Sequence, residues 1–193
     1  MKINFAVSML ACVALVAGTA GAIEYNDAKM KLPQDYRQWV FLTSGMGMSY
    51  VTGAEAAANP RFDNIFVNPE AYQAFVKTGT WPDKTVLILE SRASDSVVSI
   101  NKSGRVQTRL AGIEAHVKDA SHGGWAFYSF GGDGRQEATA IPKTATCYSC
   151  HEQNGAVDTT FVQFYSTLAE IAKKKGTFRE TTAETRSGEA ATQ

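Results

Sequence analysis

The pentapeptide Cys147-Tyr148-Ser149-Cys150-His151 limits what this chain can be more than any other feature of its sequence. Two thiols on one helical turn can both add to the vinyl groups of a haem, and the residue that follows brings an imidazole under the iron. A chance match or a redox dithiol is the competing interpretation. The pattern predicts one covalently attached haem c per chain, with Cys147 and Cys150 forming the thioethers and His151 as the proximal iron ligand.

The first 22 residues predict that the chain is exported. One basic residue, Lys2, precedes an apolar stretch over residues 5–16, and Ala20-Gly21-Ala22 fits the pattern that signal peptidase reads. A spanning helix needs roughly 20 apolar residues and this stretch is shorter, so we expect cleavage after Ala22 and a periplasmic protein without a membrane anchor. Cys12 would leave with the signal, and Cys147 and Cys150 would remain as the only pair.

Charge and composition exclude several classes of protein. The chain has 19 basic and 19 acidic side chains, which gives no electrostatic case for binding nucleic acid. Its 44% of hydrophobic residues excludes a disordered polyelectrolyte. We expect a signal peptide over residues 1–22, a single haem domain over residues 23–175, and a disordered tail over residues 176–193, where Thr, Glu, Ser and Ala predominate.

Most of the chain before the pentapeptide has the pattern of β-strands. Short runs of β-branched and aromatic residues, bounded by Gly, Asn, Asp or Pro, are typical of strands in an antiparallel sheet. The sequence therefore predicts a mainly β (α+β) fold with a sheet of five to six antiparallel strands and a few helices, not a four-helix bundle. The expected strands cover residues 39–42, 64–67, 85–89, 96–100, 105–117 and 125–130.

Helices are expected in three places. Asn68 can cap a helix whose first turn contains Pro69 and which Gly79 ends. A weaker helical signal covers residues 32–37. Residues 159–175 form an amphipathic pattern, because apolar side chains recur there at spacings of three and four.

A sixth protein ligand for the iron would have to be a methionine or a second histidine. Met46 and Met48 lie before the pentapeptide in a glycine-containing stretch and suit packing or the surface better than ligation. His116 lies on an expected strand, where a place on the polar face is favoured, and His122 precedes two glycines in an expected turn. We therefore expect one protein ligand and an open or aromatically screened distal face.

With these segments in place, the sequence resembles the cytochrome P-460 family, which includes the cytochromes c′-β. The resemblance implies a homodimer of mainly antiparallel β subunits, each with one haem that is five-coordinate through the histidine of the pentapeptide. The matching blocks are Tyr36-Arg37-Gln38-Trp39-Val40, Val67-Asn68-Pro69-Glu70-Ala71-Tyr72, Lys77-Thr78-Gly79, Gly112-Ile113-Glu114-Ala115-His116-Val117-Lys118-Asp119, Trp125-Ala126-Phe127-Tyr128, and Cys147 to His151 followed by Phe161, Phe164 and Tyr165.

One position divides this family. Members that oxidise hydroxylamine carry a lysine bonded to the haem edge, and the matching stretch here places Leu89 at that position. A leucine cannot form the bond, and Lys84, at an odd offset of five residues, falls on the opposite face of a strand. The resemblance therefore implies the cytochrome c′-β branch, whose distal pocket is apolar and which binds nitric oxide.

A second position points the other way. Glu114 matches the distal glutamate that hydroxylamine-oxidising members use for proton transfer, and a carboxylate in an apolar pocket could act as a base. The alternative is a carboxylate on the solvent face or paired with Arg109 or Lys118. The sequence leaves these two interpretations open.

Three functions follow. The first is a periplasmic haem protein that captures nitric oxide behind an apolar distal wall of Phe62 and Leu89, with Phe66 or Phe41 as alternatives to Phe62. The second is an oxidoreductase that acts on hydroxylamine or peroxide, with Glu114 as proton acceptor. The third is an electron-transfer cytochrome with a sixth protein ligand and low-spin iron.

Overall fold

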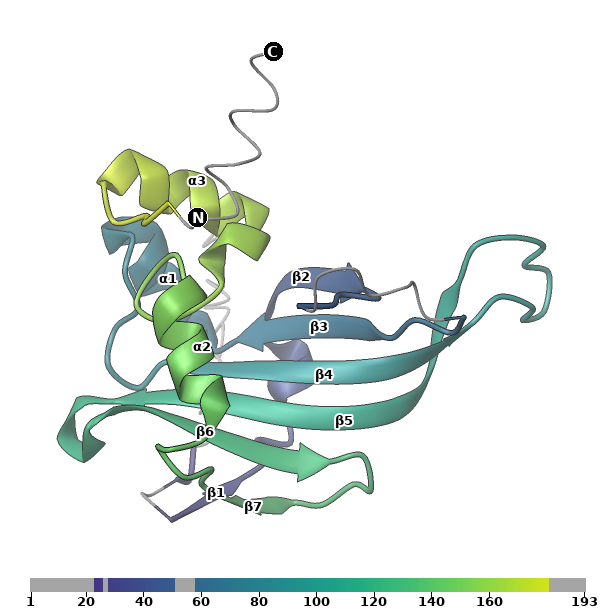
Figure 1. Ribbon diagram of the computed structural model, residues 1–193, viewed down its shortest axis with the longest axis horizontal. Helices are drawn as coiled ribbons and strands as arrows, with labels where there is room; N and C mark the ends of the chain where they lie inside the picture. The colour runs from purple at the N-terminus through teal and green to yellow at the C-terminus, as the bar shows by residue number, and fades with distance from the viewer. Residues whose placement is uncertain (1–22, 26–27, 51–57, 181–193) are drawn as a thin grey trace, which may run out of the picture.

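The computed structural model describes residues 23–25, 28–50 and 58–180. The expected signal peptide and residues 181–193 of the expected tail lie outside the described residues. Five strands form one antiparallel sheet in the order β2-β3-β4-β5-β6, and β1 pairs with β7 in a second, two-stranded sheet (Figure 1). This confirms the mainly β fold and excludes a helical bundle. The strands are β1 (Lys29–Lys31), β2 (Val40–Met46), β3 (Phe62–Val67), β4 (Val86–Asp95), β5 (Val106–Asp119), β6 (Gly124–Gly131) and β7 (Glu137–Thr139).

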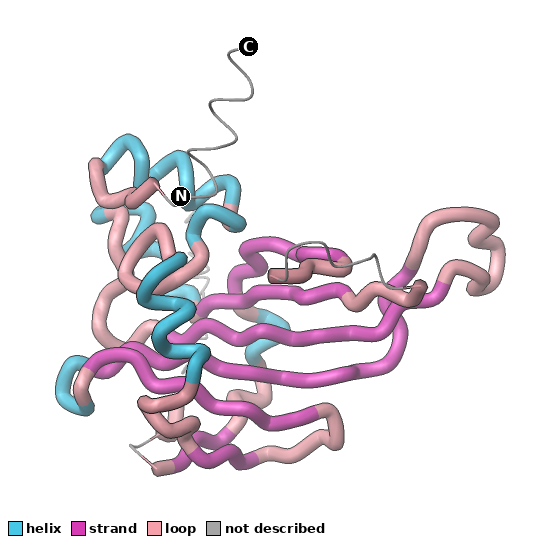
Figure 2. The backbone as a smooth tube through the Cα atoms, in the orientation of Figure 1, coloured by secondary structure: helices cyan, strands magenta, loops and turns pink. Residues whose placement is uncertain are grey.

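The described residues also form three α-helices and three short 3-10 helices. Figure 1 shows α1 and α3 together at one end of the five-stranded sheet, with α2 lying across its strands. Figure 2 shows the loop between β4 and β5 projecting from the other end. The helices are α1 (Pro69–Thr78), α2 (Thr146–Asn154) and α3 (Ser166–Lys175), and the 3-10 helices are η1 (Tyr36–Gln38), η2 (Ala120–His122) and η3 (Val162–Phe164).

The large sheet is buried on both faces, which explains its continuous apolar runs. In β4, Val86 and Ile88 belong to one core and Leu87 to the other, as the period of two in a strand requires. The core on the helical face contains Phe75 of α1 and Leu168 of α3. The core on the opposite face is closed by η1 and the two-stranded sheet. Each face of the sheet is thus covered by a different set of elements.

The helix α1 begins and ends where the sequence predicts. Asn68 occupies the N-cap position, but its side chain does not cap the helix; its Oδ1 accepts a hydrogen bond of 2.8 Å from the backbone N–H of Val86. Asn68 thereby joins the start of α1 to β4. Gly79 ends the helix with φ of 78°, a conformation that favours glycine.

A buried carboxylate lies on the face of the sheet opposite the helices. The Glu90 side chain is 4% exposed and accepts hydrogen bonds from the Tyr36 hydroxyl, from Arg37 at 2.8 Å and from Arg92 at 2.6 Å. Burial alone would raise the pKa of Glu90, but these three donors outweigh burial and hold the pKa below its ordinary value. The charged form is therefore favoured by folding.

This network predicts acid-sensitive stability that depends on one residue. A group whose pKa is lowered by folding stabilises the protein fully at pH values above its pKa in the unfolded chain, here near 4.5. This contribution is lost as the pH falls through the lower pKa of the folded protein. We expect Glu90→Gln to lower the free energy of unfolding by about 1–3 kcal/mol near neutral pH and by less in acid. Urea titrations at about pH 7 and about pH 4 measure this difference, with the exposed Glu170→Gln as control; an equal loss at both pH values would contradict it.

Two expected elements are wrong. Residues 96–100 form no strand: Ser99 adopts φ of 57°, and Val97 and Ile100 are 86% and 89% exposed, so their β-branched side chains have no layer to cover them. The continuous helix expected over residues 159–175 is also wrong. It is reduced to η3 and α3, because Thr159 adopts φ of 62° and Tyr165 interrupts the helical backbone.

The first residues of the expected tail bond to the domain. The Arg179 guanidinium donates to the carbonyls of Glu152 at 2.7 Å and Gly155 at 2.7 Å, at the end of α2. The Thr177 hydroxyl donates to the carbonyl of Gly79 at 2.7 Å. No helix among the described residues has the length and apolar character needed to cross a membrane.

Candidate functional site

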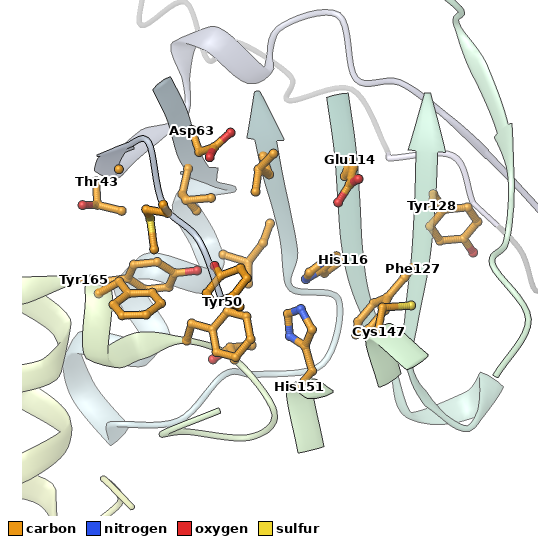
Figure 3. Close-up of a pocket in the computed structure, with 18 of the residues that line it drawn as sticks. Thr43, Tyr50, Asp63, Glu114, His116, Phe127, Tyr128, Cys147, His151 and Tyr165 are labelled. Carbon is orange, nitrogen blue, oxygen red and sulfur yellow. The ribbon is translucent and has the colours of Figure 1, made fainter. Parts of the chain in front are cut away.

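A cavity of about 250 Å³ lies between the helical face of the five-stranded sheet and residues 147–165. Each of β2, β3, β4 and β5 contributes two lining residues, two positions apart, as side chains on one face of a sheet must be. Figure 3 shows the ring of His151 at one end of the cavity, with Asp63 and Glu114 towards the other. Most of the remaining lining is aromatic or aliphatic.

The ring of His151 is held on both sides. It projects from α2 and stacks on Phe161 with 4.2 Å between ring centroids, while Phe127 of β6 contacts it at 4.9 Å. Its Nδ1 lies 2.9 Å from the carbonyl oxygen of Thr159, so Nδ1 carries the proton and donates it. The other ring nitrogen, Nε2, then has the lone pair that a metal requires. Burial lowers the pKa of His151 below its ordinary value, although the Thr159 carbonyl opposes this, so the ring is neutral near pH 7.

A tight turn supplies that carbonyl. Residues 157–160 close on themselves, with the backbone N–H of Thr160 donating to Val157 at 2.8 Å. Asp158 and Thr159 have φ of 49° and 62°, a left-handed conformation that costs non-glycine residues on the order of 1 kcal/mol each. Gly155 allows the chain to fold back, because a Cβ there would lie 2.6 Å from the carbonyl carbon of Thr159.

His116 lies in the cavity wall, so its expected place on a polar strand face is wrong. Its ring stacks on Phe127 at 4.1 Å and meets His151 edge-on at 4.7 Å. Burial, and then the neighbouring His151, lower the pKa of His116 to about 3, which keeps it neutral. Two imidazoles on opposite sides of one metal would hold their centroids about 6 Å apart, given metal–nitrogen bonds of about 2 Å. At 4.7 Å, His116 packs against His151 and does not face it across a metal.

The two cysteines lie on α2, one helical turn apart. Cys147 lines the cavity and is half-buried, while Cys150 is exposed and forms no disulfide. Between them, the Tyr148 hydroxyl accepts from the backbone N–H of Phe127 at 3.1 Å and donates to the carbonyl of Ile141 at 3.2 Å. This side chain fixes α2 to β6 and so places Cys147 and His151 at the same cavity.

Leu89 and Glu114 both line the cavity, and they are direct partners across β4 and β5. Burial, and then the charge of Asp63, raise the pKa of Glu114, although its side chain stays accessible to solvent. Among the described residues the Glu114 carboxylate has no hydrogen-bond or ion-pair partner, and Lys118 pairs with Asp158 instead. Of the two interpretations that the sequence left open, the structure favours a carboxylate in the cavity wall.

The structure does not bring Phe62 to the cavity. Asp63 and Ile65 of β3 line it, so the alternation along the strand directs Phe62 to the other face. The alternatives are on that face too: Phe66 packs on the ring of Tyr36 at 5.8 Å and on Phe41 at 5.7 Å.

Sequence reasoning missed several other cavity residues. Asp63, which accepts a hydrogen bond from Ser91, and Tyr50 carried no local motif. The spacing of two residues on one strand shows that His116 and Glu114 share a face, but it does not show which face meets the cavity. Met48, one of the methionines considered as a sixth ligand, lines the cavity. His122 belongs to η2, and its side chain lies outside the part of the chain that the structure describes.

Comparison with models of known protein families gives a match over most of the chain. The family model described as Cytochrome P460 matches residues 33–162, which include every strand of the large sheet, α2 and the 157–160 turn. No curated protein matches the chain.

Proposed function

Because the chain belongs to the cytochrome P460 family, and this family implies a haem, we propose that it is a c-type cytochrome that binds nitric oxide at an open iron site. The observation that carries the proposal is the position of His151. Its Nδ1 is committed to the Thr159 carbonyl, which leaves Nε2 as the nitrogen that can bind iron.

The residues around the cavity suit a covalently attached haem. Cys147 and Cys150 would form the thioethers from consecutive turns of α2, and His151 would bind the iron from the same helix. Phe161 and Phe127 would keep the imidazole from rotating. A ferrous haem held by one histidine supplies an iron with a free sixth position, to which a small neutral gas can bind.

Leu89 supports the nitric oxide branch of the family. Its side chain lines the cavity opposite Glu114, where a lysine would be needed to bond to the haem edge. The aliphatic side chain of Leu89 offers no donor to stabilise bound dioxygen, whereas nitric oxide needs none. The N-terminal segment and the family resemblance support a periplasmic homodimer as the form in which the protein acts.

The absorption spectrum of the purified holoprotein tests this proposal. We expect a high-spin, five-coordinate ferrous spectrum that shifts on addition of nitric oxide, because the proposal gives the iron one protein ligand, His151. We also expect no red-displaced band of a lysine-linked haem, because Leu89 cannot form that bond. A low-spin ferrous spectrum that ignores the gas would reject the proposal and favour an electron-transfer cytochrome, with Met48 as the ligand to examine first.

A second function is favoured by the position of Glu114. A carboxylate in the cavity wall without a protein partner among the described residues could accept a proton from hydroxylamine or peroxide. The same holoprotein, incubated with hydroxylamine and an artificial electron acceptor, distinguishes the two. Rapid reduction of the acceptor would identify an oxidoreductase, and its absence together with the nitric oxide shift would identify a gas-binding protein.

A further inference from the structure

We propose that Trp81 is a positioning residue for His151: its indole holds the Val157–Thr160 turn, and this turn fixes the carbonyl that orients the imidazole. The inference rests on the proposed role of His151 as the iron ligand. Trp81 lies between α1 and β4, outside the cavity lining, and 70 residues before His151 in the sequence.

A chain of buried hydrogen bonds connects Trp81 to the turn. The indole Nε1–H donates to the Thr160 hydroxyl at 2.8 Å, and this hydroxyl donates to the carbonyl of Val157 at 2.6 Å. Trp81 and Thr160 are each 2% exposed. Water therefore cannot replace a donor that is removed from this chain.

The other side of the turn is held by Lys118. Its ammonium group donates to the carbonyl of Trp81 at 2.8 Å and pairs with the carboxylate of Asp158. The ring of Trp81 is itself fixed by Phe75 of α1, with 4.3 Å between centroids. The turn is thus connected to Trp81 in two ways, directly through the Thr160 hydroxyl and indirectly through Asp158 and Lys118. Trp81 is in turn anchored in the core of the helical face.

The turn needs these contacts because its backbone is strained. Asp158 and Thr159 both adopt the left-handed conformation, and neither is a glycine. A turn released from Trp81 would relax and carry the Thr159 carbonyl away from Nδ1 of His151. A histidine ligand that loses its outer hydrogen bond becomes less basic and binds its metal less tightly.

Two tryptophan variants make a matched pair. Trp81→Phe removes the indole N–H that bonds to the turn and keeps an aromatic ring against Phe75. Trp125→Phe removes an indole N–H that is buried and has no partner within the described residues, from a side chain that is 8% exposed. Any effect of a smaller ring in the core is common to both variants, and only the first loses the hydrogen bond.

The readouts are the iron–histidine stretching frequency of the ferrous holoprotein, by resonance Raman spectroscopy, and the rate at which nitric oxide displaces His151 from the iron. We expect Trp81→Phe to lower the frequency and to raise the rate about tenfold, at the lower end of the effects seen for outer hydrogen-bond partners. We expect Trp125→Phe to change neither. Equal changes in both variants would overturn the proposal.

Substitutions at Thr160 test the same link without changing an aromatic ring. Thr160→Val keeps the shape of the side chain and removes the hydroxyl, so it should reproduce the effect of Trp81→Phe, whereas Thr160→Ser should behave as the wild type. Wild-type frequencies in both Trp81→Phe and Thr160→Val would overturn the inference and leave the proposed function intact. A wild-type holoprotein without an iron–histidine band would overturn both.

Discussion

Replacing Cys147 and Cys150 together with alanine is expected to abolish the retention of haem by the denatured chain. Thioether bonds survive unfolding, whereas a haem held only by His151 and by packing is lost when the cavity opens. The measurement is haem staining of the chain on a denaturing gel, combined with the mass of the intact protein. We expect the mass of one haem on the wild type and none on the double variant.

The single variants and a neighbouring substitution sharpen this prediction. Cys147→Ala and Cys150→Ala each leave one thiol on α2, so each should retain haem through one bond at a reduced yield. Ser149→Ala alters an exposed residue between the two cysteines and should retain haem as the wild type does. Full retention in the double variant would show that Cys147 and Cys150 are not the points of attachment.

Phe75→Ala is expected to be among the most destabilising single substitutions in the core on the helical face. Phe75 is completely buried in α1, and its ring packs on Trp81 at 4.3 Å. Truncating a buried phenylalanine removes its apolar contacts and leaves a cavity, at a cost of about 3–5 kcal/mol. Urea titration of the purified protein, followed by circular dichroism, measures the loss.

Gln73→Ala is the control for this substitution, because Gln73 is exposed on the same helix. A surface change of this kind should alter the free energy of unfolding by no more than about 0.5 kcal/mol. A loss below about 1 kcal/mol in Phe75→Ala would mean that the core collapses around the missing ring.

The strands of the large sheet could be predicted from the sequence because both of its faces are buried. Runs such as Val86-Leu87-Ile88 are apolar at every position and need no knowledge of their neighbours. Residues 96–100 have the same propensity but no covering layer, so propensity alone misled there. β1 and β7 were missed because each has three residues, of which one is buried, and they pair across more than 100 positions of sequence.

The residues of the candidate site likewise fall into those that a local motif predicts and those that depend on distant contacts. The pentapeptide predicts the role of His151 directly, because the two thiols and the imidazole are close together in the sequence. Its supporting contacts are not local: the bond from Trp81 to Thr160 spans 79 residues, and no pattern in a short window reports it. Whether His116 and Asp63 line the cavity depends on which face of the sheet meets α2. The packing of the helices decides this face.

The acceptor for His151 is a main-chain oxygen, and this affects how the site can evolve. No amino-acid replacement at position 159 deletes a carbonyl, so the identity of that residue carries no record of whether the hydrogen bond exists. Selection therefore acts on the path of the backbone. The side chains of Trp81 and Thr160 fix this path, and neither of them bonds to the imidazole. Divergence in the strength of the proposed iron–histidine bond should therefore accumulate at these two positions, while the histidine and its acceptor remain unchanged.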